Sequence, residues 1–440
     1  MTVAVIALGK IGLPVAVQIA RAGLRVIGVD TDPRVVELVS RGDPPFPGEE
    51  GLDVALREAV EKGFFQATTR TEDAVREAEV IVVLVPLVVD EAGQPDFRGM
   101  DAATDAIGRA LQHGALVSYE TTLPVGTTRT RFAPHLERAS GLKAGRDFHL
   151  VHSPERVFSG RVFRDLRRYP KLVGGLTDAC TDAGVRFYRK VLDFDDRPDL
   201  PRPNGVWGLA SAEAAEMAKL AETTYRDVNI ALANEFARFA EENGLDVYEV
   251  IEAANSQPFS RIHRPGVAVG GHCIPVYPRF YMLEDSAARL PKVAREVNLA
   301  VPARVVTKVG EHLGGLRERV VLVLGASYRG GVKETAFSGV FDLIAEIHKY
   351  GGIPVVHDPL YSADELRQLG MTPYELGQPI DAAILQADHR EYMGLKPADL
   401  PGCKVIYDGR GVLDAEVWEG VTFLQIGVGS PTAAKSSATD

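Results

Sequence analysis

Several features are scarce or absent in this chain of 440 residues, and each absence narrows the class of protein. Only three cysteines occur, Cys180, Cys273 and Cys403, which is too few for a disulfide framework and favours a reducing compartment. The longest apolar run, residues 80–89, is interrupted by Pro86 and reaches about half of the roughly 20 residues that a membrane helix needs. No basic patch precedes an apolar core at the N-terminus. We therefore expect a cytoplasmic protein without a membrane anchor.

Positive charge is also in deficit. The chain has 49 Lys and Arg against 60 Asp and Glu, which gives a net charge of −11. A surface of this sign repels phosphates, so neither nucleic acid nor an anionic membrane is expected as the main partner. The remaining composition, 45% apolar and 25% charged, is that of an ordinary globular protein, and the length predicts about three domains.

The N-terminal part of the chain alternates strands and helices. Residues 3–7 are a short apolar run, residues 13–21 have helical spacing, and residues 25–29 form the next apolar run. This alternation is typical of a parallel sheet covered by helices. Further strands are expected at residues 80–85, 116–119 and 149–152.

The middle of the chain has a different pattern. Residues 193–208 are rich in Asp, Pro and Gly, which predicts a linker or an exposed loop. Ser211 is expected to cap a long helix that ends near Glu242, before an Asn-Gly pair. Helical spacing returns at residues 278–289 and 302–313. The middle therefore reads as helical.

A second alternating unit begins at Arg319, and the tail after Gly429 has the composition of a disordered segment. The predicted fold class is α/β, with two Rossmann-like parallel-sheet domains joined by a long central helix and a helical middle domain. The elements expected in the second unit are strands at residues 320–324, 354–357, 382–385, 405–407 and 421–425, and a helix at residues 340–350.

A candidate dinucleotide-binding turn follows the first strand. The string Ala7-Leu8-Gly9-Lys10-Ile11-Gly12 departs from Gly-x-Gly-x-x-Gly only at its first position. Gly9 lets the backbone approach a pyrophosphate, and Gly12 lets helix and strand pack closely. Asp30, 18 residues after Gly12, can accept both ribose hydroxyls and would repel the 2′-phosphate of NADP. The alternative is a purely structural glycine turn, but the position at the end of a first strand favours NAD.

Cys273 is the candidate nucleophile. It lies in Gly-Gly-His-Cys-Ile-Pro, just before a helix expected to start at Pro278, and a helix N-terminus favours the thiolate. The alternative is a buried structural cysteine, as we expect for Cys180 and Cys403. No Cys and His spacing resembles a zinc site, so no metal is predicted.

Two charged residues are candidates for proton transfer or charge stabilisation. Lys219 lies mid-helix among apolar residues, where it either stabilises an oxyanion or extends its stem to the surface. Glu155 follows a predicted strand end, where ligand sites of α/β proteins lie. Taken alone, Glu155 would read as a surface carboxylate.

Together these strings resemble the nucleotide-sugar 6-dehydrogenases, the UDP-glucose/GDP-mannose dehydrogenase family, over roughly residues 3–425. The resemblance is greatest to the branch that oxidises UDP-N-acetylhexosamines (ManNAc or GlcNAc). It is carried by residues 11–14 (IGLP), 120–128 (ETTLPVGTT), 153–157 (SPERV), 213–231 (EAAEMAKLAETTYRDVNIA) and 270–275 (GGHCIP).

The resemblance implies a four-electron oxidation of the sugar C6 hydroxyl by two NAD+, through a cysteine-bound intermediate, to the uronate. By motif, Cys273 would be the nucleophile, Lys219 the oxyanion stabiliser, Thr122 a residue that places water, and Glu155 an acid/base or water-orienting group. NAD would be bound by Gly9, Lys10, Ile11, Gly12, Asp30, Arg34, Pro86 and Thr121. The nucleotide sugar would be bound by Arg156, Val157, Lys219, Asn229, Arg261, Gly270, Gly271, Tyr328 and Arg329.

The resemblance also implies a domain plan and partners. We expect an NAD-binding domain at residues 1–205, a helical dimerisation domain with the cysteine loop at 206–314, a nucleotide-sugar-binding domain at 315–430 and a disordered tail at 431–440. The expected partners are a UDP-sugar and further copies of the chain in a homodimer or higher oligomer, with neither nucleic acid nor membrane.

Several positions depart from the family pattern. Tyr277 stands where the family has Asp, Thr223 where it has Asn, and Ala336 where it has Arg. Arg329 occupies the place of a lysine and is expected to contact phosphate instead. Residues 85–88 read Val-Pro-Leu-Val where the family has Val-Pro-Thr-Pro.

These departures leave alternatives open. A phenol has a pKa near 10, so Tyr277 cannot replace a carboxylate at neutral pH. The chain is then a member with an unusual sugar, a variant that stops at the 6-aldehyde or thioester, or a redox-neutral epimerase or isomerase that retains NAD. Alternatively Glu155 or His272 takes over the proton transfer, or the position simply tolerates change. A non-catalytic sugar-nucleotide-binding protein would not need to keep Cys273 and Lys219.

Overall fold

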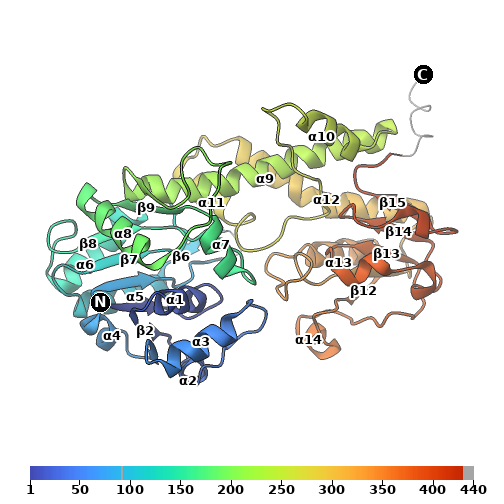
Figure 1. The fold of residues 1–440 in the computed structure, drawn as a ribbon. Coiled ribbons are helices and arrows are strands. Elements are labelled where there is room, and N and C mark those ends of the chain that lie inside the picture. Colours follow the sequence, from blue (N-terminus) through green and yellow to red (C-terminus); the bar gives the residue numbers. More distant parts are fainter. Residues whose placement is uncertain (91–92, 430–440) are drawn as a thin grey trace. The chain divides into compact units, whose positions relative to one another are not determined.

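The computed structural model describes residues 1–90 and 93–429, and the chain divides into two compact units (Figure 1). The first comprises Met1–Glu222 with Leu283–Asp285, and the second comprises Thr223–Met282 with the chain from Ser286 onward. The predicted disordered tail lies outside the described residues. Among the described residues, none of the helices is both long enough and apolar enough to cross a bilayer.

Eight strands form one sheet in the described part of the first unit, in the order β10-β9-β8-β7-β4-β1-β2-β3. Neighbouring strands are parallel except β8 and β9. The chain runs from β1 outward to β2 and β3 on one side and to β4 and β7 on the other, so the strand order reverses between β1 and β4. Ligands of such sheets bind outside the carboxyl ends of the strands at this point. The strands are β1 (Thr2–Ile6), β2 (Arg25–Val29), β3 (Phe65–Thr68), β4 (Val80–Val83), β7 (Leu116–Tyr119), β8 (His149–His152), β9 (Lys171–Gly175) and β10 (Val206–Leu209).

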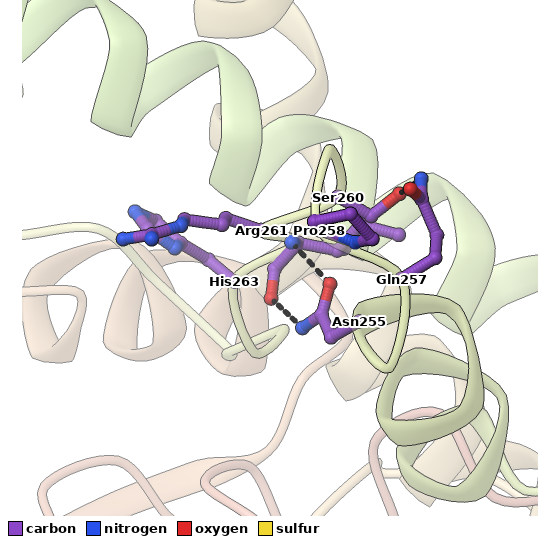
Figure 2. Close-up of a pocket in the computed structure, with 7 residues that line it drawn as sticks. Asn255, Gln257, Pro258, Ser260, Arg261 and His263 are labelled. Carbon is purple, nitrogen blue, oxygen red and sulfur yellow. Dashed lines mark hydrogen bonds between the residues drawn. The ribbon is translucent and has the colours of Figure 1, made fainter.

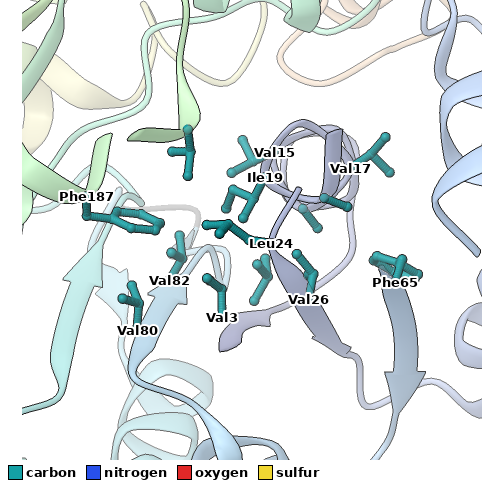
Figure 3. Packing of buried hydrophobic residues seen from close by; sticks show 14 of the residues in the cluster. Val3, Val15, Val17, Ile19, Leu24, Val26, Phe65, Val80, Val82 and Phe187 are labelled. Atoms are coloured by element: carbon teal, nitrogen blue, oxygen red, sulfur yellow. The ribbon is translucent and has the colours of Figure 1, made fainter. Parts of the chain in front are cut away.

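Helices cover both faces of this sheet, which explains why its central strands are apolar throughout. Along β1, Val3 and Val5 pack on one face against α1, whereas Ala4 and Ile6 pack on the other. Figure 3 shows the first cluster, with Val3, Val26 and Val82 beneath α1. The helices are α1 (Gly12–Arg21), α2 (Pro33–Ser40), α3 (Leu52–Glu61), α4 (Thr71–Glu77), α5 (Arg98–Ala110), the π-helix η1 (Thr128–Phe132), α6 (Ala133–Ser140), α7 (Val162–Arg168) and α8 (Asp178–Val191); β5 (Val88–Val89) and β6 (Pro95–Asp96) form a hairpin.

The second unit has a five-stranded sheet in the order β12-β11-β13-β14-β15, and all its neighbouring strands are parallel. Its strands are β11 (Val320–Leu324), β12 (Ile353–His357), β13 (Ala382–Leu385), β14 (Val405–Asp408) and β15 (Thr422–Gln425). Its helices are α10 (Val247–Asn255), α12 (Leu290–Leu313), α13 (Val340–Lys349), α14 (Ala363–Gln368) and the 3-10 helices η2 (Arg390–Gly394), η3 (Pro397–Asp399) and η4 (Ala415–Val417). Two helices have residues in both units, α9 (Ala212–Asn243) and α11 (Tyr277–Glu284).

The predicted α/β class with two Rossmann-like sheets is confirmed, as is the cap of the long helix. The Ala214 N–H donates to Ser211 Oγ at 3.1 Å, and α9 ends at Asn243. The linker predicted at residues 193–208 is wrong at its end, because residues 206–209 are strand β10, which pairs with β9 at the edge of the sheet. An edge strand needs one partner only, so the loop-like composition just before it dominates its sequence pattern.

Two helix boundaries also differ from expectation. Helix α11 begins at Tyr277 and ends at Glu284, five residues before the predicted end at Arg289. Helix α12 begins at Leu290 and runs through Pro302, where a helix start was predicted. Proline removes one helical hydrogen bond, but buried Val301 and Val305 on both sides of it hold the helix against the core.

Candidate active site

The turn after β1 has the geometry of a dinucleotide cradle. Ala7 has a left-handed backbone (φ 77°), and its N–H donates to the Val29 carbonyl at 2.8 Å. A Cβ on Gly12 would lie 2.0 Å from the Ala7 oxygen, so only glycine fits there. A Cβ on Gly9 would meet nothing within 4 Å, which leaves open space beside an exposed backbone. The close packing predicted for Gly12 is therefore present. Ala7, which stands at the first glycine position of the motif, has a strained backbone conformation.

Asp30 is fixed beside this turn at the end of β2. Its Oδ2 accepts the Leu8 N–H at 2.9 Å, and its Oδ1 accepts the Asp32 N–H at 3.0 Å. Each carboxylate oxygen keeps a further lone pair for a ribose hydroxyl. Helix α1 starts at Gly12 with no side-chain cap and no acidic residue in its first turn, so its positive end suits a pyrophosphate. These residues fit NAD.

The other predicted cofactor residues make contacts within the protein or lie partly or fully exposed. Arg34 is exposed and forms a bidentate pair with Asp32, and this hydrogen bonding lowers the pKa of Asp32. Pro86 is exposed, and Thr121 Oγ donates to the Val85 carbonyl at 2.7 Å, which ties the ends of β4 and β7 together. Lys10 is exposed on the turn, and Ile11 is half-buried before α1.

Glu155 belongs to a buried charge cluster. Lys171 Nζ lies 2.7 Å from Glu155 Oε2 and 2.9 Å from Glu120 Oε2. Burial raises the pKa of Glu155, but the Lys171 ammonium outweighs it and the net pKa is lowered. Burial raises the pKa of Glu120 to about 7. Sequence reasoning assigned no role to Glu120 or Lys171, although Glu120 opens the string at residues 120–128 and Lys171 begins an otherwise apolar strand.

A second buried carboxylate, Glu216, ties α9 to the loop after β7. It accepts hydrogen bonds from the Gly126 N–H (2.5 Å), the Thr128 N–H (2.8 Å) and the Thr128 hydroxyl (2.7 Å). Burial raises its pKa to about 7. Thr122 is buried in the same loop, and Lys219 lies three residues after Glu216, on the same face of α9 and 5% exposed. Glu216 therefore fixes the segment of Thr122 to the helix of Lys219.

In the second unit, the cysteine loop packs against the turn after β11. The Gly271 N–H donates to the Ala336 carbonyl at 2.9 Å. A Cβ on Gly270 would lie 2.6 Å from Tyr328 Cβ, and Gly271 has a φ of 87° with the Tyr328 ring against it. Both predicted glycines are thus needed for contact with Tyr328. The structure brings these three predicted residues together.

Cys273 follows this contact as a half-buried free thiol. Its carbonyl accepts the Tyr277 N–H at 3.0 Å, where α11 begins. Cys180 and Cys403 are buried, and burial raises the pKa of Cys403 to about 11. Of the three thiols, Cys273 is therefore the one open to reaction.

Arg410 was missed by sequence reasoning, although it organises this part of the second unit. Its guanidinium donates to the carbonyls of Gln386 (2.5 Å), Ala268 (3.2 Å) and Tyr328 (3.3 Å). It thereby joins the cysteine loop to the segment of Tyr328. Arg329 lies next to this segment, with its Nε 3.2 Å from the Tyr328 hydroxyl.

Asn229 and Arg261 also lie together. Asn229 donates to the Arg261 carbonyl at 2.8 Å and accepts the His263 N–H at 2.8 Å, so its amide positions the loop. Arg261 lines a cavity of about 290 Å³ together with His263 and Asn255, and Asn255 is hydrogen-bonded to the loop backbone (Figure 2).

The last two predicted substrate residues follow Glu155. Arg156 donates to the Pro170 carbonyl at 2.5 Å and contacts Glu222 at 3.4 Å, and Val157 is half-buried. Direct contact of these residues with substrate stays a prediction. Within residues 1–90 and 93–429, no group of three or more His, Cys, Asp or Glu side chains is placed to hold a metal ion.

Comparisons with known proteins extend over most of the chain. Three models of the UDP-glucose/GDP-mannose dehydrogenase family match it: the NAD binding domain at residues 1–192, the central domain at 213–299 and the UDP binding domain at 322–415. The chain is 34% identical to a UDP-N-acetyl-D-mannosamine dehydrogenase of Pyrococcus horikoshii over 94% of this chain and 96% of the relative. It is 33% identical to an NDP-N-acetyl-D-galactosaminuronic acid dehydrogenase of Ralstonia solanacearum, over 94% and 97%. The solved structure of the UDP-D-ManNAc dehydrogenase from Pyrococcus horikoshii superposes with a TM-score of 0.86 at 32% identity, over 98% of this chain and all of the other.

Proposed function

Because this chain belongs to the UDP-glucose/GDP-mannose dehydrogenase family, we propose that it oxidises the C6 hydroxyl of a UDP-activated N-acetylhexosamine to the uronate. The chain is an NAD-dependent oxidoreductase of the nucleotide-sugar dehydrogenase type, so the resemblance and the cofactor inferred from its motifs are confirmed. The relatives named as UDP-N-acetyl-D-mannosamine dehydrogenases make UDP-N-acetylmannosamine the first substrate to test. The observation that carries the proposal is the half-buried free thiol of Cys273 on a loop whose glycines pack against Tyr328.

The proposed reaction converts one alcohol, two NAD+ and one water into one carboxylate, two NADH and three protons. NAD, held by the turn of Gly9 and Gly12 and by Asp30, supplies the hydride acceptor. Cys273 Sγ adds to the C6 aldehyde, and the resulting adduct is oxidised to a thioester that water hydrolyses. A thiolate suits this role because it is a soft nucleophile and a good leaving group.

Three further residues are assigned the accompanying proton and charge chemistry. Glu155, a carboxylate in its pair with Lys171, accepts a proton. Lys219 stabilises the oxyanion that forms at C6, and Thr122 helps to place the hydrolytic water. These roles rest on the family motifs and on the burial of Lys219 and Thr122, whose helix and loop are joined by the hydrogen bonds of Glu216.

A count of NADH per sugar tests the function. We expect UDP-N-acetylmannosamine to yield two NADH per uronate, measured by absorbance and mass spectrometry. The Cys273→Ala variant should bind the sugar nucleotide without turnover, whereas Cys403→Ala, the matched control at a buried thiol, should keep it. One NADH per aldehyde would show the variant that stops early, and retained NAD without net NADH would show the redox-neutral enzyme. Unchanged turnover of Cys273→Ala would refute the covalent route.

We also propose that the chain works as a homodimer through α9. Within the second unit, Tyr225, Leu232, Phe236 and Phe239 follow helical spacing along α9 and are 53%, 41%, 39% and 56% exposed. An exposed apolar stripe of this kind suits contact with a second copy of the same helix. Sedimentation equilibrium should give twice the chain mass or a multiple of it, and a monomer at all concentrations would contradict the proposal.

A further inference from the structure

Lys171 begins strand β9 with its ammonium group enclosed between two carboxylates. We propose that Lys171 is a positioning residue for the reaction, because its ammonium group holds Glu155 as an oriented carboxylate while Glu120 anchors the ammonium from the other side. This inference rests on the proposed function, in which Glu155 accepts a proton.

The ammonium group has little freedom. Lys171 is 5% exposed, and its backbone N–H donates to the Gly205 carbonyl at 3.0 Å at the start of the strand. Nζ lies 4.8 Å from the centre of the Tyr188 ring, so an aromatic face closes one side. A buried ammonium is costly unless it is paired, and here both nearby carboxylates pair with it.

Glu120 is itself held in place, which makes it an anchor. The Tyr188 hydroxyl donates to Glu120 Oε1 at 2.5 Å and lies 2.7 Å from the Ser118 hydroxyl. Its other oxygen, Oε2, accepts from Lys171. Because Glu120, Tyr188 and Ser118 are all buried, bulk water does not compete for these hydrogen bonds.

Both carboxylate oxygens of Glu155 accept hydrogen bonds. Oε2 accepts from Lys171, and Oε1 accepts the Arg156 N–H at 2.8 Å. The Glu155 backbone N–H donates to the Glu120 carbonyl at 3.0 Å, so hydrogen bonds fix both the backbone and the side chain of this residue. The bonds already made set the direction of the lone pairs that remain.

The charges around the cluster explain why Lys171 controls the protonation of Glu155. The contacting groups are two carboxyl groups and one ammonium. With Glu155 ionised and the pKa of Glu120 raised to about 7, their net charge changes from 0 to −1 around neutral pH. Beside them, His152 is fully buried, and burial together with Lys171 lowers its pKa to about 3, so it is neutral. Tyr188 is neutral because burial raises its pKa. Outside the cluster, the Arg156 guanidinium contacts Glu222 of α9. Without Lys171, burial and mutual repulsion would favour a protonated Glu155 that cannot accept a proton.

The test compares Lys171→Met with Lys171→Arg across the pH profile of kcat. In Lys171→Met we expect the acid limb to move to higher pH by about two units or more, and kcat at pH values below the displaced limb to fall by about 10²-fold, since Glu155 is protonated there and cannot act as a general base. The KM for NAD should stay within about twofold, because the cradle at Gly12 is separate. Lys171→Arg keeps the charge and should restore the acid limb. An unmoved limb in Lys171→Met, or equal loss in both variants, would overturn the proposal.

Glu120→Gln provides a second variant that leaves the Lys171–Glu155 pair in place. Because burial raises the pKa of Glu120 to about 7, Glu120 is already uncharged at the lower pH where Glu155 titrates, so the acid limb should stay in place in Glu120→Gln, unlike in Lys171→Met. A shift in the same direction as Lys171→Met would contradict the charge argument.

An infrared measurement separates this inference from the proposed function, since it needs no turnover. At neutral pH, Lys171→Met should gain a band of protonated carboxyl groups, and adding Glu155→Gln should reduce that band. Its absence in Lys171→Met would overturn the positioning role even if the wild-type chain oxidises the sugar. A wild-type chain inactive on every UDP-sugar would instead refute the proposed function.

Discussion

The replacement of Glu216 by glutamine should change the pH dependence of stability in a direction that the structure fixes. Burial raises the pKa of Glu216 from 4.5 to about 7 in the folded chain. Below about pH 4.5 the group is protonated in both states and contributes nothing. Between these values the folded state binds more protons than the unfolded state, so stability falls as pH rises. Above about pH 7 the loss reaches about 3 kcal/mol, at about 1.4 kcal/mol for each pKa unit.

Glu216→Gln removes this loss but alters one hydrogen bond. The glutamine oxygen can still accept from Thr128, whereas its amide group would face the Gly126 N–H. A buried donor left without an acceptor costs about 1–3 kcal/mol. The variant should therefore be less stable than wild type by that amount near pH 5, and as stable or more stable near pH 8. The difference between the two chains should change by about 3 kcal/mol over this range.

Urea unfolding of the full chain near pH 5, 6, 7 and 8 measures this difference. Hydrogen exchange of the segment that contains Gly126 and Thr128 localises it. Glu213→Gln is the matched control on the same helix, because the hydrogen bond from Arg129 lowers the pKa of Glu213. Its stabilisation is complete above pH 4.5 and is lost only below that value. Because the charge of Glu213 also helps to raise the pKa of Glu216, its replacement should cause a small change from pH 5 to 8, well below that of Glu216→Gln. A pH-independent difference for Glu216→Gln would refute the reasoning.

Two further predictions concern the dinucleotide turn. Ala7→Gly should relieve the left-handed strain of about 1 kcal/mol, partly offset by the chain entropy of glycine. The melting temperature should rise or stay equal with an unchanged KM for NAD, and a clear loss of stability would contradict the strain. Asp30→Asn should keep an acceptor for the Leu8 N–H but lose the charge, so the KM for NAD should rise by roughly tenfold and NADP should become an acceptor. Unchanged selectivity between the two cofactors in steady-state assays would show that Asp30 does not face the ribose.

The central strands could be predicted from sequence because burial on both faces leaves an unmistakable apolar run. Residues 116–119, 149–152 and 320–324 have the bounds that their patterns predicted. Strand β10 could not be predicted in this way, since its one partner, β9, sets it at the sheet edge. The course of α12 through Pro302 likewise depends on packing that the local pattern does not contain.

Some residues of the candidate site could likewise be predicted from local sequence, and others could not. Cys273, Gly12 and Asp30 stand in short strings whose spacing carries their chemistry. The cluster of Lys171 and Glu120 joins residues 51 positions apart, because Glu120 directly follows β7 and Lys171 begins β9, two strands separated by β8. No local pattern marks such a pair, because each partner satisfies the other only after the sheet has assembled.

The cysteine loop is attached to its own unit by main-chain hydrogen bonds, Val267 N–H to the Gly409 carbonyl and Gly271 N–H to the Ala336 carbonyl. Such bonds do not depend on which side chain the accepting residue carries. An arginine, an alanine or another residue at position 336 can therefore leave the loop in place. The side chain at position 336 can therefore change, and with it the groups offered to a ligand, without moving Cys273, the proposed nucleophile. In this region the main chain fixes the position of the cysteine loop, while the side chain at position 336 is open to change.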